Sequence, residues 1–164
     1  ILGLDIGTEV DGWYGDSAIT MPIGEISKKD EELIACAKDA LYYAIDIIED
    51  GMRFKELSKT IEDFITSRGY QPLVRFCGHG IGRKPHEDPE IPNYLEHGGT
   101  KSGPKIKNGM VFCIEPMICQ KDRNPVILKN GWDVVSADGL RGSHYEHTVA
   151  VVDGRAVILS NREN

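Results

Sequence analysis

The sequence predicts an α/β (α+β) chain in which two adjacent helices pack against a largely antiparallel sheet. Apolar residues recur at helical spacing within residues 27–51 and again within 54–68. Strand-like alternation around Asp-Gly turns indicates hairpins at residues 1–22 and 143–160. An Asn-Gly turn leads into a further apolar strand within residues 104–120.

Local signals predict where both helices begin and end. Ser27 is suited to cap the first helix with its hydroxyl, and the acidic residues 30–32 suit the positive end of the helix dipole. Gly51 is expected to end this helix, because glycine readily adopts the left-handed conformation of a C-terminal cap. The second helix is expected to end at Gly69.

Length and charge restrict the class of protein and its partners. The 164 residues suit one domain, and 40% hydrophobic with 27% charged residues is ordinary for a soluble globular protein. The net charge of −7, from 19 basic and 26 acidic residues, argues against nucleic acid and anionic membranes as partners. No run approaches the ~20 apolar residues of a membrane span, and no signal peptide is expected. We therefore expect a cytoplasmic monomer.

The four cysteines are expected to be free thiols. Cys36 falls within the first helix and Cys113 within an apolar run, and no CxxC pair links these two with Cys77 or Cys119. Free thiols of this kind fit a reducing cytoplasm better than disulfides do.

The chain opens at Ile1 with a strand-like run and has no initiator methionine. Because strands seldom begin at a true terminus, we expect an upstream segment to be missing.

Acidic residues interrupt apolar strands at three places. Asp5 lies inside ILGLDIG, Glu115 inside VFCIEPM, and Glu146 inside HYEHTVAVV. Outward-facing strand positions would explain any one of these acids, but a set of three must be paired or bind metal, because an unpaired buried charge is costly. Asp16 and one imidazole, from His79 or His86, complete an oxygen-rich set that suits hard or borderline divalent ions. Four carboxylates balance two such ions, so a dinuclear site is expected.

Five separated motifs resemble those of the methionine aminopeptidases, in particular the shorter, bacterial-like type I class. They are LDIG, GDSA, GHGIGRKPHEDP, MVFCIEPM and SHYEHTV, and together they span nearly the whole chain. The resemblance implies the pita-bread metallopeptidase fold, a largely antiparallel curved sheet with helices on its outer face. It identifies residues 1–164 as a catalytic metallopeptidase domain that lacks its upstream segment.

The resemblance also implies a ligand set for two divalent ions, drawn from cobalt, manganese, iron(II), zinc and nickel. The implied metal ligands are Asp5, Asp16, His79, Glu115 and Glu146, with Asp16 and Glu146 as the bridging pair.

The implied activity is removal of the initiator methionine from peptides and nascent proteins by a hydroxide that bridges two metals. Glu115 would act as the general base, and His86 would hydrogen-bond the substrate carbonyl or tetrahedral intermediate. His79 and Trp132 would also contact the substrate, Trp132 near its side-chain pocket. The expected partners are peptide and nascent-protein N-termini, with transient ribosome contact and no nucleic acid substrate or membrane.

Two features depart from the family pattern. Pro85 stands where an aromatic residue often precedes the second histidine. The family's upstream segment, which supplies another catalytic histidine and much of the side-chain pocket, would precede Ile1. We therefore expect residues 1–164 alone to release little methionine.

Two alternatives remain open. Aminopeptidase P and prolidase share the fold and equivalent metal ligands but act on proline-containing ends. Proteins of this fold that only bind partners usually lose metal ligands, whereas all five are present here. His97, His144 and His147 are interpreted as structural, except that His147 is placed to orient Glu146.

Overall fold

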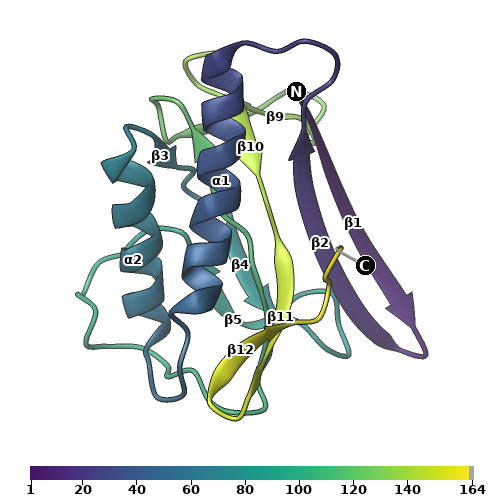
Figure 1. The fold of residues 1–164 in the computed structure, drawn as a ribbon, viewed down its shortest axis with the longest axis vertical. Coiled ribbons are helices and arrows are strands. Elements are labelled where there is room, and N and C mark those ends of the chain that lie inside the picture. The colour runs from purple at the N-terminus through teal and green to yellow at the C-terminus, as the bar shows by residue number, and fades with distance from the viewer. Residues whose placement is uncertain (163–164) are drawn as a thin grey trace.

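A computed structural model describes residues 1–162, and it places two adjacent helices against a set of antiparallel strands (Figure 1). The helices are α1 (Lys28–Asp46) and α2 (Phe54–Ser67), which pack on each other, while hairpin β1–β2 lies on the far side of the strands. The strands are β1 (Leu2–Val10), β2 (Trp13–Met21), β3 (Gln71–Pro72), β4 (Cys77–Gly80), β5 (Glu87–Pro92), β6 (Val111–Ile114), β7 (Met117–Cys119), β8 (Pro125–Ile127), β9 (Val134–Ser136), β10 (Gly142–His144), β11 (His147–Val152) and β12 (Arg155–Ile158).

Every strand pair formed by the described residues is antiparallel, which confirms the expected sheet type. Five strands form one sheet in the order β12-β11-β6-β4-β5, and β10-β7-β3 form a second. Hairpins β1-β2 and β8-β9 pair only internally. The apolar strand expected within residues 104–120 is divided between two sheets, since β6 ends at Ile114 and β7 begins at Met117. Pro116 has no N–H to continue a ladder, so the chain changes sheet beside Glu115.

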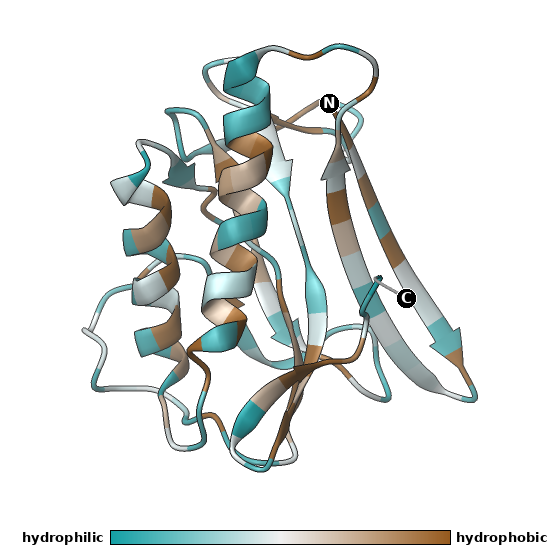
Figure 2. Ribbon diagram, viewed as in Figure 1, coloured by the Kyte–Doolittle hydropathy of each residue, from teal (hydrophilic) through white to brown (hydrophobic). Residues whose placement is uncertain are grey.

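The hydrophobic core lies between the helices and the sheets. Figure 2 shows hydrophobic residues alternating with hydrophilic ones along both helices, as expected for helices that bury one face. The fully buried side chains include Leu33, Leu41, Leu57, Ile61, Ile65, Phe112 and Ile114.

No helix among residues 1–162 is long and apolar enough to cross a membrane. All four cysteines are free, as predicted.

Both predicted Asp-Gly turns are present. Asp11 and Gly12 have φ of 53° and 75°, and Asp153 and Gly154 have φ of 51° and 81°. Positive φ at both central residues is the signature of a two-residue hairpin turn whose twist matches its strands.

The prediction that the first helix continues to Gly51 was wrong. Helix α1 ends at Asp46, and Glu49 instead forms a β-bridge with Arg155.

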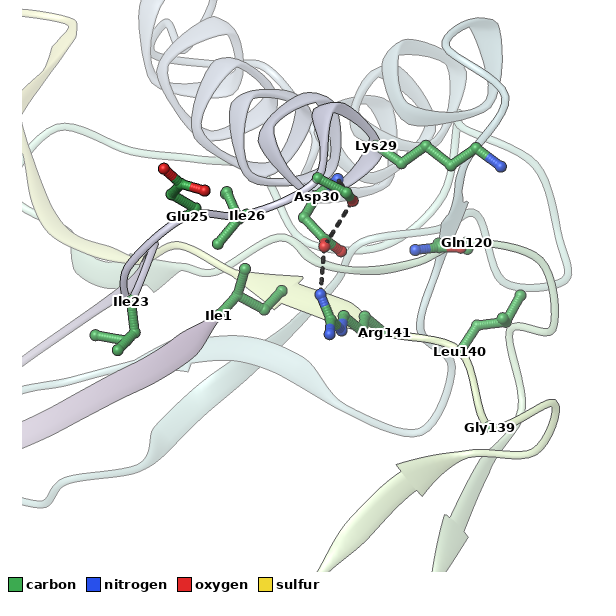
Figure 3. A pocket seen from close by; sticks show the side chains of 11 residues that line it. Ile1, Ile23, Glu25, Ile26, Lys29, Asp30, Gln120, Gly139, Leu140 and Arg141 are labelled. Atoms are coloured by element: carbon green, nitrogen blue, oxygen red, sulfur yellow. Dashed lines mark hydrogen bonds and ion pairs between the residues drawn. The ribbon is translucent and has the colours of Figure 1, made fainter.

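An ion pair between the buried Asp30 and the exposed Arg141 fixes the start of α1 to the segment that leads into β10 (Figure 3). The Ser27 hydroxyl accepts a hydrogen bond from the Asp30 N–H (3.2 Å) and donates one to the Asp30 carboxylate (2.8 Å), which confirms Ser27 as the N-cap. The Arg141 guanidinium donates to the same carboxylate. The hydrogen bond from Ser27, together with Arg141, lowers the pKa of Asp30 although burial opposes this.

Asp30→Asn should lower the thermal midpoint at pH 7. Because the pKa of Asp30 is lower in the folded state, its ionised form stabilises the fold above the ordinary value of 3.8, and this contribution is lost as pH falls through the lowered pKa. Melting curves from pH 7 to pH 3 should therefore show the parent and the variant converging. Asp39→Asn, on the exposed face of α1, is the control and should leave the midpoint unchanged. A constant difference at every pH would contradict this role for Asp30.

Two glycines allow β4 to lie close to its neighbours. A Cβ at Gly78 would overlap the carbonyl oxygen of Cys113, and one at Gly80 would overlap that of Asp88. Backbone atoms cannot turn aside as a flexible side chain can, so only glycine fits at either position. His79 lies between them, and its position therefore depends on both close approaches.

Gly80→Ala should destabilise the protein by about 1–3 kcal/mol or more, the usual cost of forcing extra volume into a packed region. Urea denaturation measures this change. Gly15→Ala is the matched control, because its new Cβ would make ordinary contact 3.6 Å from the Thr8 hydroxyl. Equal losses from the two substitutions would show that the close approach at Gly80 is unimportant.

Candidate metal centre

The sequence-predicted ligands line a single cavity of about 440 Å³ between hairpin β1–β2 and the two larger sheets. All five predicted metal ligands and His86 contribute to its lining. The full lining is Asp5, Asp16, Leu73, Phe76, Cys77, His79, His86, Glu115, Met117, Val134, His144 and Glu146. Segments far apart in the sequence thus present their acidic and imidazole groups to one space.

The hairpin supplies two of the carboxylates. Asp5 on β1 is paired with Ala18, and Asp16 on β2 is paired with Gly7. Residues opposite each other in an antiparallel pair share a face, so Asp5 and Asp16 are diagonal neighbours on one face of the hairpin. The Thr148 hydroxyl donates to the Asp16 carbonyl oxygen (2.8 Å) and accepts from the Asp16 N–H (2.9 Å). This pair of bonds holds the hairpin against β11.

His79 is fixed in a form that leaves one ring nitrogen available. Its Nδ1 lies 3.0 Å from the carbonyl oxygen of Gly80. A carbonyl only accepts hydrogen bonds, so Nδ1 carries the proton and Nε2 keeps its lone pair in the neutral ring. Nε2 lies 3.4 Å from Oε1 of Glu115. A histidine held in this way is typical of a metal ligand.

The two glutamates lie beside each other at the ends of paired strands. Glu115 follows β6, Glu146 precedes β11, and these strands pair with Ile114 opposite His147. The buried side chain of Asn93 donates a hydrogen bond to the Glu115 carbonyl oxygen (2.9 Å). The Glu146 N–H donates to Ala18 on β2 (2.8 Å), which ties this residue to the hairpin.

Burial and the neighbouring carboxylates disfavour the ionised form of Glu146. Burial, followed by the charges of Glu115, Asp16 and Asp5, raises the pKa of Glu146 to about 9. Glu146 is only 2% exposed, and its Oε1 has no hydrogen-bond partner among residues 1–162. A buried acceptor without a donor is costly, and a cation would both occupy that oxygen and offset the repulsion.

Within residues 1–162, three overlapping groups of side chains could hold a cation. In each group the ligand atoms lie within 4.8 Å of one another. The groups are Asp5–Asp16–Glu146, Asp16–His79–His86 and His79–Cys113–Glu146. Glu115 joins them through its contact with His79. Carboxylate oxygens with one available imidazole nitrogen suit divalent manganese, iron, cobalt or zinc, so the residues fit the predicted metal chemistry.

His86 and Trp132 have different surroundings from the predicted ligands. The exposed His86 packs edge-on against His79, with ring centroids 4.3 Å apart. Trp132 lies in the turn between β8 and β9, is 85% exposed and does not line the cavity. From that hairpin Val134 reaches the cavity instead.

His147 and His144, both interpreted as structural from the sequence, have different surroundings: His147 lies in the core and His144 lines the cavity. His147 is fully buried, and its ring nitrogens contact the hydroxyls of Ser160 (2.9 Å) and Tyr42 (3.2 Å). Burial is the main cause that lowers its pKa to about 4. Both ring nitrogens are thus engaged away from Glu146. His144, in contrast, lines the cavity, and its Nε2 lies 3.6 Å from Oε2 of Glu115. The available sequence signal was its position two residues before Glu146 in an extended segment.

Known proteins with similar sequences are methionine aminopeptidases. The chain is 63% identical over 163 residues to the methionine aminopeptidase of Helicobacter pylori strain 26695, covering 99% of this chain and 64% of that protein. It is 37% identical over 160 residues to methionine aminopeptidase 1 of Bacillus subtilis, covering 98% of this chain and 63% of the relative. The chain thus spans somewhat less than two thirds of the length of these relatives.

Solved structures of similar shape confirm the predicted pita-bread fold. A crystal structure of methionine aminopeptidase from Thermotoga maritima matches 98% of this chain and 63% of its own, with a TM-score of 0.93 and 36% identity. Prolidase from Pyrococcus furiosus matches 99% of this chain and 41% of its own, with a TM-score of 0.77 and 26% identity.

One family model covers most of the sequence. The model described as metallopeptidase family M24 matches residues 1–153. That range contains every carboxylate and imidazole of the cavity. The chain therefore belongs to metallopeptidase family M24.

Proposed function

We propose that this chain carries the metal-binding and catalytic residues of an aminopeptidase that removes N-terminal methionine from peptides and nascent proteins. The observation that carries the proposal is the convergence of four carboxylates and His79 on one cavity, in a chain 63% identical to a methionine aminopeptidase. Residues 1–164 would form a single catalytic domain.

The proposed metal ligands are Asp5, Asp16, His79, Glu115 and Glu146, and together they would hold two divalent ions. Asp16 and Glu146 would be shared between the ions. Asp16, Glu146 and His79 each belong to two of the three overlapping ligand groups. Of these, only the carboxylates have two oxygens to offer to two ions, which supports a bridging role for Asp16 and Glu146. Divalent ions bound here would act as Lewis acids that lower the pKa of water and polarise a carbonyl group.

The chain's own groups would position the peptide and move the proton. Glu115 would accept a proton from the attacking water, since its carboxylate lines the cavity at only 8% exposure. His86, exposed beside His79, would donate a hydrogen bond to the oxygen that gains negative charge. Leu73, Phe76 and Met117 give the cavity an apolar wall that suits an unbranched apolar side chain such as methionine. Trp132 is retained as a proposed substrate contact from the β8–β9 turn.

The wider setting is also a proposal. We expect the substrates to be the N-termini of nascent proteins, met in the cytoplasm by a monomer that contacts the ribosome transiently. Four free cysteines support a reducing compartment. Proline-directed cleavage is the nearest rival, because prolidase shares the fold. Competing Met-Ala and Ala-Pro peptides would separate the two specificities, and preferential release from Ala-Pro would overturn the proposal.

The metal-free chain should bind two equivalents of Mn²⁺ or Co²⁺ in titration calorimetry. Binding to the folded state alone should stabilise it by about 2.7 kcal/mol when free metal is 100 times its dissociation constant, and so raise the thermal midpoint. Asp16→Asn should reduce the stoichiometry or affinity, whereas Asp133→Asn, an exposed acid outside the cavity, should not. Absence of heat and of any midpoint shift would rule out the metal site.

Glu115→Gln should reduce kcat far more than it raises KM for a Met-Ala peptide. The amide keeps an oxygen for the metal but cannot accept the proton, so the loss appears in the transition state. Steady-state kinetics at saturating metal measure this in a chain extended at its N-terminus, because residues 1–164 alone are expected to release little methionine. An effect on KM alone would show that Glu115 is not the base.

His86→Ala should lower kcat by roughly 10²–10³-fold, the usual effect of losing one donor to a developing oxyanion. Metal stoichiometry should stay at the parent value, because His86 is proposed to contact substrate. Loss of a metal equivalent would instead make His86 a ligand, as its proximity to Asp16 and His79 would permit.

A further inference from the structure

His144 is a third imidazole in the cavity, and neither the composition nor the family motifs gave it a role. It is the last residue of β10, and its side chain is 22% exposed. It lines the cavity together with the proposed ligands.

Glu115 lies between two imidazoles. Its Oε1 is 3.4 Å from Nε2 of His79, and its Oε2 is 3.6 Å from Nε2 of His144. Each carboxylate oxygen therefore faces a different ring. Since His79 directs a lone pair toward Oε1, that side of Glu115 is the side open to a cation, and His144 lies on the other side.

The Nε2 atom of His144 is buried and has no hydrogen-bond partner among the described residues 1–162. Glu115 Oε2 is a complementary acceptor. A shift of less than about 1 Å would bring the pair to the ~2.9 Å of an N–H···O hydrogen bond. The pairing would satisfy a polar nitrogen that is otherwise costly to bury.

The backbone of His144 is fixed from two sides. The hydroxyl of the buried Thr20 accepts from the His144 N–H (2.8 Å) and donates to its carbonyl oxygen (2.9 Å). On the other side, β10 pairs with β7, and His144 is opposite Met117, two residues after Glu115. The ring is thus anchored relative to the carboxylate it faces.

We infer that His144 is a positioning residue that donates a hydrogen bond from Nε2–H to Glu115 Oε2 and keeps Oε1 directed at the metal beside His79. The inference rests on the metal site proposed above. Groups that orient a ligand in this way typically change metal affinity or activity by 10–100-fold when removed. His144 would therefore act on the site through Glu115 without binding the metal itself.

The test compares substitutions at His144 by Co²⁺ titration of the metal-free chain, with calorimetry for affinity and visible absorption for coordination geometry. His144→Ala should weaken Co²⁺ binding by roughly 10–100-fold at unchanged stoichiometry and alter the absorption spectrum. His144→Gln should restore both, because its amide N–H₂ reaches about as far and still donates. His97→Ala, a histidine outside the cavity, is the control and should match the parent.

Each other outcome contradicts the inference in a distinguishable way. Parent-like affinity and spectrum in His144→Ala would overturn the role of His144 while leaving the metal site intact. Loss of a whole metal equivalent would make His144 a ligand and overturn the positioning role. No Co²⁺ binding by the parent would overturn both proposals. If His144→Ala lowers the metal-free thermal midpoint, His144→Phe, which keeps a ring but lacks the donor, replaces it in the comparison.

Discussion

Mutual repulsion among the carboxylates of the cavity is the constraint on which the site depends. Folding brings Asp5, Asp16, Glu115 and Glu146 together from four different segments, and it buries the last of them almost completely. The repulsion would push these segments apart, so the fold must hold them by other contacts. A bound cation would offset this repulsion, because each carboxylate would then be attracted to the cation as a ligand.

Two threonines provide much of that restraint in the same way. Thr148 binds both backbone groups of Asp16 with one hydroxyl, and Thr20 does the same to His144. Strand β2 belongs to a separate two-stranded sheet, yet these hydroxyls connect it to β10 and β11. Each threonine hydroxyl thus supplies the interstrand hydrogen bonds that backbone groups would supply in a sheet, at a place where β2 does not pair with β10 or β11. A carboxylate and an imidazole of the cavity are fixed by this device.

Local chemistry made much of the fold predictable. Asp-Gly turns require positive φ, and Ser27 had a donor to cap, so hairpins and the start of the first helix followed from the residues themselves. Pro116 is a local signal for a break in the strand, but the sheet that receives the next segment is set by long-range pairing. The end of α1 at Asp46 has no local signal of this kind. The clustering of Asp5, Glu115 and Glu146 could be anticipated because acids inside apolar strands need a partner, and the resemblance of the motifs added Asp16 and His79. The location of His144 could not, because its meaning depends on the register of β10 with β7.

The two histidines of the glycine-rich segment 77–94 differ in burial and in restraint, and this difference separates their proposed roles. His79 is 7% exposed, its Nδ1 is tied to its own strand, and glycines on both sides fix its backbone. A ring restrained in this way has one direction in which to offer a lone pair, which suits a metal ligand. His86 is exposed, lines the cavity and packs edge-on against His79. A hydrogen-bond donor to the transition state must follow a substrate oxygen that moves during the reaction. The exposed ring of His86, packed against the fixed ring of His79, suits that task better than a second buried imidazole would.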